Sequence, residues 1–364
     1  MCKRIFKEQT SDEGEVPFYK IGTFGSEPDA FISRELFNEY KTKYPYPNKG
    51  DILISASGSI GRTVEFTGRD EYFQDSNIVW LKHGNEIDNS FLKVLYSVIE
   101  WSCEGSTIKR LYNDNFLKTE FMLPKIDEQI KIGNYFSNLD HLITLHQRKC
   151  EQTKKLKKYM LQKMFPQNGA KVPEIRFDGF TYDWEQRKLS ELLEKYEDPV
   201  ETPHDGYERV GIRSHAKGTF HSFVEPGKEL DTAKMYRVAA DKFILNITFA
   251  WEHAVAITDN NDAGKLVSHR FPQFSFNPKL KPHFFKYLML DKKFREHLEL
   301  SSPGGAGRNR VLKISDMLKY EIKLPSIEEQ IKIGEYFDSL DYLITLHQRQ
   351  TDFYKKISFY YISS

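Results

Sequence analysis

Two stretches of this sequence are nearly the same, and they decide the fold. Residues 123–148 read LPKIDEQIKIGNYFSNLDHLITLHQR, and residues 324–349 read LPSIEEQIKIGEYFDSLDYLITLHQR. The stretches lie 201 residues apart, and 20 of their 26 positions carry the same residue. Chance does not produce identity over such a length, so the chain contains two copies of one unit, and each copy ends in this stretch.

Each repeated stretch has the features of a long helix. Pro124 and Pro325 end the preceding strand. The acidic pairs at 127–128 and 328–329 suit a helix N-terminus, where the macrodipole favours negative charge. Apolar residues then recur at helical spacing in both copies: Tyr135, Phe136, Leu139, Leu142 and Ile143, and Tyr336, Phe337, Leu340, Leu343 and Ile344.

The length of the first helix predicts a helical partner. The pattern continues to Phe165, which predicts about 38 residues over 128–165, or roughly 57 Å at 1.5 Å per residue. The second copy predicts a helix from 329 to about 361. A helix this long has no partner within one small domain, so we expect an antiparallel coiled-coil pair. The apolar stripe is then mainly the core of that pair.

The regions before the two stretches predict domains of mixed α/β fold. Short apolar strands are expected at 51–55, 77–81 and 242–247, and helices at 91–100 and 282–298. The predicted fold is therefore two similar domains, related by a pseudo-two-fold internal repeat and separated by the two long helices. Its expected parts are a first domain (1–122), a first helix and spacer (123–168), a second domain (172–323) and a second helix (324–364).

Composition excludes several classes of protein. The 364 residues carry 53 Lys and Arg against 52 Asp and Glu, so a nucleic-acid binder of this kind must concentrate its positive charge locally. The three cysteines lie far apart, which excludes a disulfide framework and a cysteine zinc finger and fits a reducing cytoplasm. No apolar run is long enough for a membrane span, and no signal-peptide core follows Met1. We expect a cytoplasmic protein.

Motifs for catalysis are missing from the sequence. It contains no phosphate-binding G-x-x-x-x-G-K-[ST] loop, no Asn-Pro-Pro-aromatic motif and no Phe-x-Gly-x-Gly. Pro28-Asp29 with Glu39-Tyr-Lys41 fits a short nuclease pattern, which leaves a Mg²⁺-dependent nuclease as an alternative. His146 and His347 recur in both copies, yet no ligand set accompanies them. We therefore expect no metal and no cofactor bound by this chain.

Basic residues in glycine-containing loops are the candidate DNA contacts. Glycines let a backbone approach DNA closely, while arginine and lysine bind phosphates or guanine. The candidates are Lys109 and Arg110 before the first stretch, Arg308 and Arg310 before the second, the cluster Arg213, His215 and Lys217, and Arg62 in a Ser-Gly-Ser-Ile-Gly-Arg segment. The alternatives are a solvated loop for each cluster and a structural turn for Arg62. Six lysines over 149–163 fit a solvated helix face better than a DNA contact.

Together these features resemble the specificity subunit of type I restriction-modification enzymes. Three motifs carry the resemblance: the doubled Leu-Pro-x-Ile-x-Glu-Gln-x-x-Ile-Gly, the opening Val172-Pro-Glu-Ile-Arg-Phe-Asp-Gly-Phe-Thr-Tyr-Asp-Trp184 followed by Lys188-Leu-Ser-Glu-Leu192, and the basic glycine-rich segment before each repeat. The resemblance implies two target-recognition domains, each of which recognises one half of a bipartite double-stranded DNA sequence, and helices that set the gap between the halves.

The resemblance also implies partners and one departure. Methyltransferase subunits, two in number, are expected to dock on the helices and carry S-adenosylmethionine, and restriction subunits are expected to supply ATP- and Mg²⁺-dependent translocation and cleavage. Residues 172–201 have no counterpart before the first domain, which we interpret as a shortened first domain. A silent, scaffold-only copy is therefore an alternative function.

Overall fold

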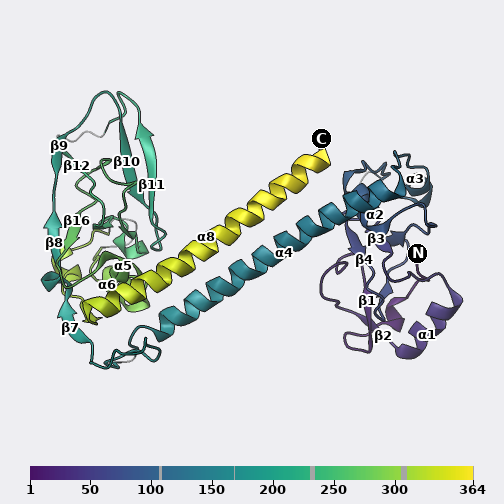
Figure 1. Ribbon diagram of the computed structural model, residues 1–364, viewed down its shortest axis with the longest axis horizontal. Helices are drawn as coiled ribbons and strands as arrows, with labels where there is room; N and C mark the ends of the chain where they lie inside the picture. The colour runs from purple at the N-terminus through teal and green to yellow at the C-terminus, as the bar shows by residue number, and fades with distance from the viewer. Residues whose placement is uncertain (106–108, 168, 230–233, 305–309, 364) are drawn as a thin grey trace. The chain divides into compact units, whose positions relative to one another are not determined.

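The computed structural model describes residues 1–105, 109–167, 169–229, 234–304 and 310–363. The chain divides into two compact units, one of Met1–Arg148 with His347–Ser364 and the other of Lys149–Leu346 (Figure 1). We call the globular parts of these units the first body and the second body.

The first body consists of two small sheets and short helices. One sheet has the order β2-β1-β5, with β1 antiparallel to β2 and parallel to β5. The other has the order β4-β3-β6, with β3 antiparallel to both neighbours. Its elements are η1 (Lys7–Gln9), β1 (Val16–Tyr19), β2 (Phe31–Ile32), α1 (Arg34–Lys43), β3 (Ile52–Ser55), β4 (Thr63–Glu65), β5 (Tyr72–Phe73), β6 (Ile78–Trp80), α2 (Asn89–Val98) and α3 (Asn113–Leu117).

The second body is larger and has three sheets, ordered β11-β10-β15-β12-β9, β14-β13-β16-β8 and β17-β7. Its strands are β7 (Glu185–Lys188), β8 (Leu193–Tyr196), β9 (Pro199–Glu201), β10 (Tyr207–Ile212), β11 (Thr219–Val224), β12 (Lys234–Arg237), β13 (Phe243–Leu245), β14 (Val255–Ile257), β15 (Leu266–Val267), β16 (Gln273–Phe276) and β17 (Glu321–Leu324). Its helical segments are η2 (Leu189–Glu191), η3 (Ala250–Glu252), α5 (Pro282–Leu288), α6 (Lys292–Leu300) and α7 (Ile314–Met317).

The two bodies share one topology, as the internal repeat predicted. The strands β11-β10-β15 repeat the order and directions of β2-β1-β5, since β10 is antiparallel to β11 and parallel to β15. The strands β14-β13-β16 likewise repeat β4-β3-β6. The strands β7, β8 and β9 are additional, and each joins a different sheet of the second body. All three come from residues 185–201, the region without a counterpart in the first body.

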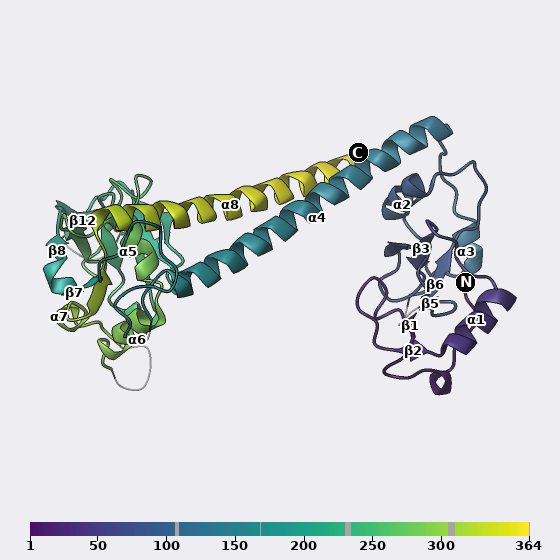
Figure 2. The ribbon, with the colours of Figure 1, turned by 60° about the horizontal axis from the view of Figure 1, so that its bottom comes forward.

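One predicted helix is wrong, because residues 282–298 form two helices rather than one. The chain turns between α5 and α6, which Figure 2 shows as separate elements. In a continuous helix Phe285 and Phe294 would lie about 13.5 Å apart along the axis. Here their ring centroids are 6.1 Å apart, and both rings contact Phe243. The break lets both aromatic rings enter one core.

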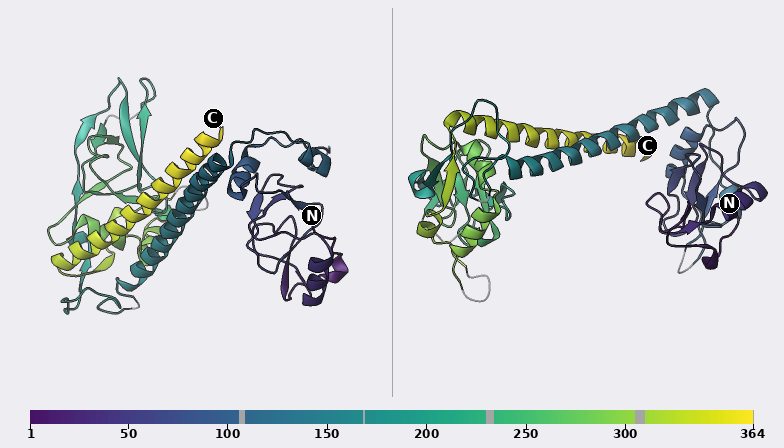
Figure 3. Two further views of the ribbon diagram at one scale, coloured as in Figure 1. Left: turned by 45° about the vertical axis from the view of Figure 1, so that its right-hand side comes forward. Right: turned by 90° about the horizontal axis from the view of Figure 1, so that it is seen from below.

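The repeated stretches form the long helices α4 (Ile126–Lys163) and α8 (Ile327–Ser363). In the first unit His146 lies beside His347, with the two Nδ1 atoms 3.0 Å apart. In the second unit Lys157 of α4 forms an ion pair with Asp341 of α8. Residue numbers rise along one helix as they fall along the other, so the pair is antiparallel, as predicted (Figure 3). Among the described residues, no helix has both the length and the apolar character that crossing a membrane requires.

A buried glutamine docks each long helix on its body. In the first body Gln129 donates to the carbonyls of Pro124 and Glu86 and accepts from the amide of Asp88, the residue before α2. In the second body Gln330 donates to the carbonyls of Pro325 and Lys279 and accepts from the amide of Lys281, the residue before α5. The same side chain, 201 residues apart, therefore makes the same three hydrogen bonds.

A glycine one turn further along each helix allows close packing. A Cβ atom at Gly133 would lie 2.7 Å from the amide nitrogen of Phe91, and one at Gly334 would lie 3.0 Å from Cβ of His283. Such contacts are tighter than packed side chains tolerate, so a residue with a side chain would push the helix away from its body. The identity of the repeat at these positions thus has a packing cause.

The apolar stripe has a second use that its spacing did not predict. Phe337 and Leu340 lie in the core of the second body, where the ring of Phe337 packs on Tyr287 at 5.0 Å and on Phe165 at 6.0 Å. In the first unit Leu139 is buried, whereas Tyr135 is exposed and Phe136 is half-buried. Leu142, Ile143 and Ile344 are half-buried and Leu343 is exposed. Much of the stripe therefore joins helix to body rather than helix to helix.

Candidate nucleic-acid interface

The second body presents a strained basic loop between β10 and β11. Arg213, His215 and Lys217 alternate with less exposed residues, so all three side chains face solvent. His215 and Ala216 both adopt positive φ angles, of 63° and 51°. Their amides donate to the carbonyls of Glu252 and His253, at 2.9 and 2.8 Å. Positive φ angles at two consecutive residues other than glycine strain the backbone, and such strain is often found at functional sites.

Arg310 approaches the same place from the far end of the body's sequence. Its guanidinium lies 5.5 Å from the ring centroid of Trp251 and forms an ion pair of 3.4 Å with Glu299. Trp251 belongs to η3, as does Glu252, whose carboxylate accepts a hydrogen bond of 2.6 Å from Ser214. The short helix η3 therefore holds both basic segments, and the fold brings Arg310 together with the loop of Arg213, His215 and Lys217.

The residue after η3 is rigidly held. His253 has a φ of 62°, and its Nε2 lies 2.9 Å from the carbonyl oxygen of Met289. Burial lowers the pKa of His253 below its usual value, although the hydrogen bond to Met289 acts in the opposite direction. A buried histidine in this conformation fixes the end of η3. The basic side chains thus stand on a preformed support.

The first body has a smaller basic surface of the same kind. Arg110 pairs with Ser57 in an isolated β-bridge, so the segment of Lys109 and Arg110 lies against the start of the turn that ends at Arg62. Lys109, Arg110 and Arg62 are all exposed. The guanidinium of Arg62 donates to the carbonyl of Ile21 at 2.8 Å, which favours a partly structural role for this residue.

The two basic surfaces occupy equivalent places in the two bodies. After the first basic segment, the amide of Leu111 donates to the carbonyl of Ala56 at 2.8 Å; after the second, the amide of Leu312 donates to Ile247 at 2.9 Å. Ala56 follows β3 and Ile247 lies just beyond β13, the central strands of equivalent sheets. The described end of each basic segment therefore returns to the equivalent central strand of its body. Arg308 lies outside the described residues.

Sequence reasoning missed Trp251, Ser214 and Glu252, which join the two basic segments. No spacing pattern connects these residues to Arg310, because the chain passes through β14, β15, β16 and the helices α5 and α6 before it reaches Arg310. The one available signal was chemical: a tryptophan within a polar turn is a suitable partner for arginine.

The lysine-rich end of α4 makes mainly local ion pairs. Lys154 pairs with Glu151, Lys157 with Asp341 and Lys163 with Glu174. These carboxylates neutralise half of the six lysines over 149–163. The charge left over is that of an ordinary solvated helix face.

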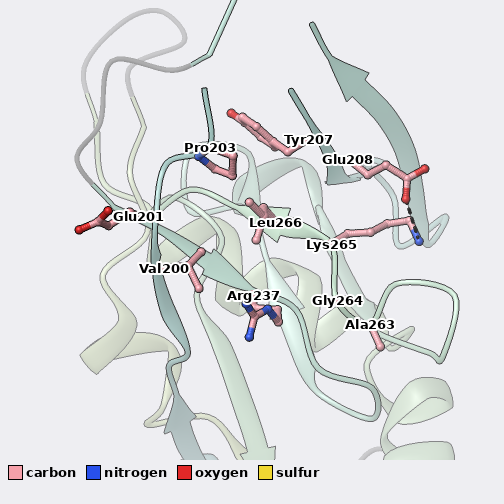
Figure 4. Close-up of a pocket in the computed structure, with 10 residues that line it drawn as sticks. All are labelled: Val200, Glu201, Pro203, Tyr207, Glu208, Arg237, Ala263, Gly264, Lys265 and Leu266. Carbon is pink, nitrogen blue, oxygen red and sulfur yellow. Dashed lines mark ion pairs between the residues drawn. The ribbon is translucent and has the colours of Figure 1, made fainter. Parts of the chain in front are cut away.

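A pocket on the five-stranded sheet of the second body does not add a basic site. Figure 4 shows that Arg237, Lys265 and Glu208 line it with Tyr207 and Val200. Lys265 pairs with Glu208 at 3.5 Å, and Arg237 lies 3.6 Å from Asp198. The positive charges in this pocket are balanced by acids.

The residues of the nuclease pattern have separate partners in the structure. Asp29 pairs with Lys20 at 2.9 Å, Glu39 with Lys43 at 2.9 Å, and Lys41 with Asp70 at 3.2 Å. In the part of the chain that the structure describes, no three His, Cys, Asp or Glu side chains gather as a metal site would require. The arrangement offers no support for nuclease chemistry.

Two bodies of one topology, each with a basic surface, are the features of a protein that recognises DNA with two domains. Comparison with known proteins agrees with this class. The family model described as "Type I restriction modification DNA specificity domain" matches residues 1–155 and 182–352. This chain belongs to that family, which recognises DNA and does not itself catalyse a reaction.

Individual relatives carry corresponding names. A Haemophilus influenzae protein named as type I restriction enzyme specificity subunit S.HindORF215P is 55% identical over 149 residues, which span 40% of this chain and 39% of that protein. The type I restriction enzyme MjaVIII specificity subunit of Methanocaldococcus jannaschii is 24% identical over 84% of this chain and 75% of its own. The solved S subunit of a type I system from M. genitalium shares the fold, with a TM-score of 0.55, 15% identity, and coverage of 99% of this chain and 91% of that one.

Proposed function

We propose that this chain is the DNA sequence-specificity subunit of a type I restriction-modification complex. The second body recognises one half of a bipartite duplex target through the surface around η3, and the first body recognises the other half through the surface of Arg62, Lys109 and Arg110. The observation that carries this proposal is that the residues following each basic segment, Leu111 and Leu312, hydrogen-bond just beyond the equivalent central strand in both bodies.

Recognition divides between charge and base contacts. Arginine and lysine bind phosphates in a salt-dependent manner, and that binding carries little sequence information. A bidentate arginine–guanine contact contributes about 1–3 kcal/mol of discrimination. Arg310 suits the second role because Trp251 holds its guanidinium from one side. Joining two modest sites in one chain raises their effective local concentration, so binding is tight only where both half-sites are present at the correct spacing.

The long helices act as the ruler between half-sites and as the docking surface for partner subunits. Two methyltransferase subunits carry S-adenosylmethionine, and restriction subunits supply the ATP- and Mg²⁺-dependent steps. Apolar side chains that remain exposed on the helices support a docking role, among them Tyr342, Phe353 and Phe359. All chemistry takes place on the partners, and this chain selects the site.

Co-expression with the modification subunit of the same complex, followed by long-read mapping of methylated adenines, tests this function. We expect a bipartite motif with two defined halves. A motif confined to one half would assign recognition to the second body alone. A complex with its modification subunit that binds all duplexes equally across a range of salt concentrations would refute the specificity role.

A scaffold without DNA recognition is the second candidate. One observation favours it: the strands β7, β8 and β9 complete three sheets of the second body and have no counterparts in the described part of the first. Replacing Arg308 and Arg310 with alanine separates the two functions. Unchanged DNA affinity in an intact complex supports the scaffold, and lost affinity supports specificity.

A further inference from the structure

The hairpin of β10 and β11 in the second body has two faces of opposite character. Its strands form six residue pairs, and β11 is an edge of the five-stranded sheet (Figure 1). Val210 and Ile212 are buried in an apolar cluster on one face. Because side chains alternate along a strand, Arg209 and Gly211 belong to the opposite face.

Arg209 is held at one of its three guanidinium nitrogens. Its partner across the hairpin is Ser222, whose hydroxyl oxygen accepts a hydrogen bond of 2.8 Å from Nε. Within the described residues, no hydrogen bond or ion pair uses Nη1 or Nη2 of this exposed side chain. Ser222 therefore fixes the guanidinium and leaves two donors for a ligand.

A second arginine stands on an aromatic ring further along the same face. The amide of Arg213 donates to the carbonyl of Gly218 at 2.9 Å, which continues the hairpin ladder. The guanidinium of Arg213 lies 5.3 Å from the ring centroid of Phe220 and donates to the carbonyl of Thr219. Phe220 is 40% exposed, and a Cβ atom at Gly211 would lie 2.9 Å or less from three of its ring carbons. The glycine thus leaves room for the ring that supports Arg213.

The positive charge of this face is uncompensated. Neither Arg209 nor Arg213 forms an ion pair in the part of the chain that the structure describes. The neighbouring Glu208 belongs to the other face and pairs with Lys265 at 3.5 Å. A glycine inside a strand weakens the strand and often marks the close approach of a ligand. Free guanidinium groups beside an exposed ring suit a ligand with phosphates and flat base edges.

The hairpin is also a place where the two bodies differ. In the second body it leads into the loop of His215 and Lys217, which is held on η3. The equivalent strands of the first body, β1 and β2, pair at two positions, and neither contains an arginine. Domains that recognise different half-sites on one scaffold are expected to differ in the element that contacts the bases.

We propose that this face of the hairpin, defined by Arg209, Phe220 and Arg213, lies in the major groove of its half-site, and that Arg209 determines specificity by binding a guanine. This inference rests on the function proposed above. The major groove of B-DNA, about 12 Å wide, admits a two-stranded ribbon. The free nitrogens of Arg209 donate to O6 and N7 of the guanine, the ring of Phe220 contacts a thymine methyl group, and Arg213 binds a phosphate. Ser222 is a positioning residue that acts through Arg209.

Binding by the assembled complex with its modification subunit tests the role of Arg209. The probes are a duplex with the motif found by mapping methylated adenines and a duplex with both half-sites scrambled. Arg209→Ala should weaken binding to the motif about tenfold or more, change binding to the scrambled duplex by less than about twofold, and relax one G·C position in the methylation map. Arg209→Lys keeps the charge, so it should preserve the salt dependence while it loses part of the discrimination.

Arg237→Ala is the matched control, because it removes an exposed arginine from the same sheet that already lies near Asp198. It should leave the motif and the ratio of the two affinities unchanged. Thermal unfolding and gel filtration of each complex check that the variants fold and assemble.

The positioning role of Ser222 has its own test. Ser222→Ala should lower the ratio of motif to scrambled affinity about threefold, whereas Ser222→Thr keeps a hydroxyl and should retain the ratio. On the Arg209→Ala background, Ser222→Ala should cause no further loss, because both act on one contact. Equal ratios for Ser222→Ala and the unaltered complex would remove Ser222 from this role.

The outcomes separate this inference from the proposed function. An unaltered complex that binds both duplexes equally would overturn the proposed function and this inference with it. A specific unaltered complex whose motif and affinities survive Arg209→Ala would overturn this inference alone. Equal losses on both duplexes would make Arg209 a phosphate contact and would overturn its role in specificity.

Discussion

Replacing Gln330 with alanine should strongly destabilise the second body. The side chain is fully buried and makes three hydrogen bonds, to the carbonyls of Pro325 and Lys279 and from the amide of Lys281. Truncation leaves these backbone groups buried without their partner. At about 1 kcal/mol for each lost bond, the free energy of unfolding should fall by about 3 kcal/mol.

The measurement is thermal and chemical unfolding of the full chain. For a unit of this size, a loss of about 3 kcal/mol lowers Tm by about 6–12 °C. Hydrogen exchange should accelerate first at the start of α5, where the amide of Lys281 loses its acceptor. Gln129→Ala should have the same effect in the first body, because it makes the same three bonds.

Gln348→Ala is the matched control, because this glutamine lies on the exposed face of α8. It should change the free energy of unfolding by less than about 0.5 kcal/mol. A Gln330→Ala variant as stable as Gln348→Ala would refute the reasoning that a repeated glutamine fixes each helix to its body.

Four other features of the fold lead to further expected outcomes. Glu329→Ala should cost about 3–5 kcal/mol by leaving Arg176 without its buried partner, as measured by urea unfolding; a change below about 1 kcal/mol contradicts it. Deleting seven residues within 151–162 removes about 10.5 Å of helix and should shorten the preferred DNA spacer by about 3 base pairs in methylation mapping; an unchanged spacer refutes the ruler. Arg310→Ala should weaken binding of the assembled complex to its target by about 1–3 kcal/mol, with Lys319→Ala as the surface control, and equal affinities would remove Arg310 from the interface. Burial acts to raise the pKa of Asp338, but hydrogen bonds from Lys286, Tyr287 and His283 outweigh it and hold this pKa below its ordinary value. The carboxylate therefore stabilises the fold above the ordinary pKa of an aspartate, and this contribution is lost as the pH falls through the lowered pKa. Asp338→Asn should make stability depend less on pH in the acid range, and an unchanged acid dependence contradicts the assignment.

The sequence by itself determined the repeat, the two long helices and their pairing. Identity between residues 123–148 and 324–349 is visible without coordinates, and helical periodicity is a local property. The helix bounds agree to within about two residues, since α4 spans Ile126–Lys163 and α8 spans Ile327–Ser363. Length alone required a helical partner. The family also followed from motifs that are each a short continuous stretch of the chain.

Only the tertiary structure decided which side chains meet. The convergence of Arg310 and the loop of His215 on η3 depends on how β14, β15 and β16 lead the chain back, and no local pattern encodes that path. The break between α5 and α6 is likewise a tertiary feature, because it lets Phe285 and Phe294 both pack against Phe243.

The same reason explains the difference between the two bodies. From sequence, residues 172–201 are one segment without a counterpart; in the fold, they supply one strand to each of three sheets and an arginine to a buried glutamate. Strand pairing joins residues far apart in the chain, as in β7 with β17, so it depends on long-range geometry rather than on periodicity. The sequence determined that a segment differs between the two copies, and the tertiary structure decided what that segment covers.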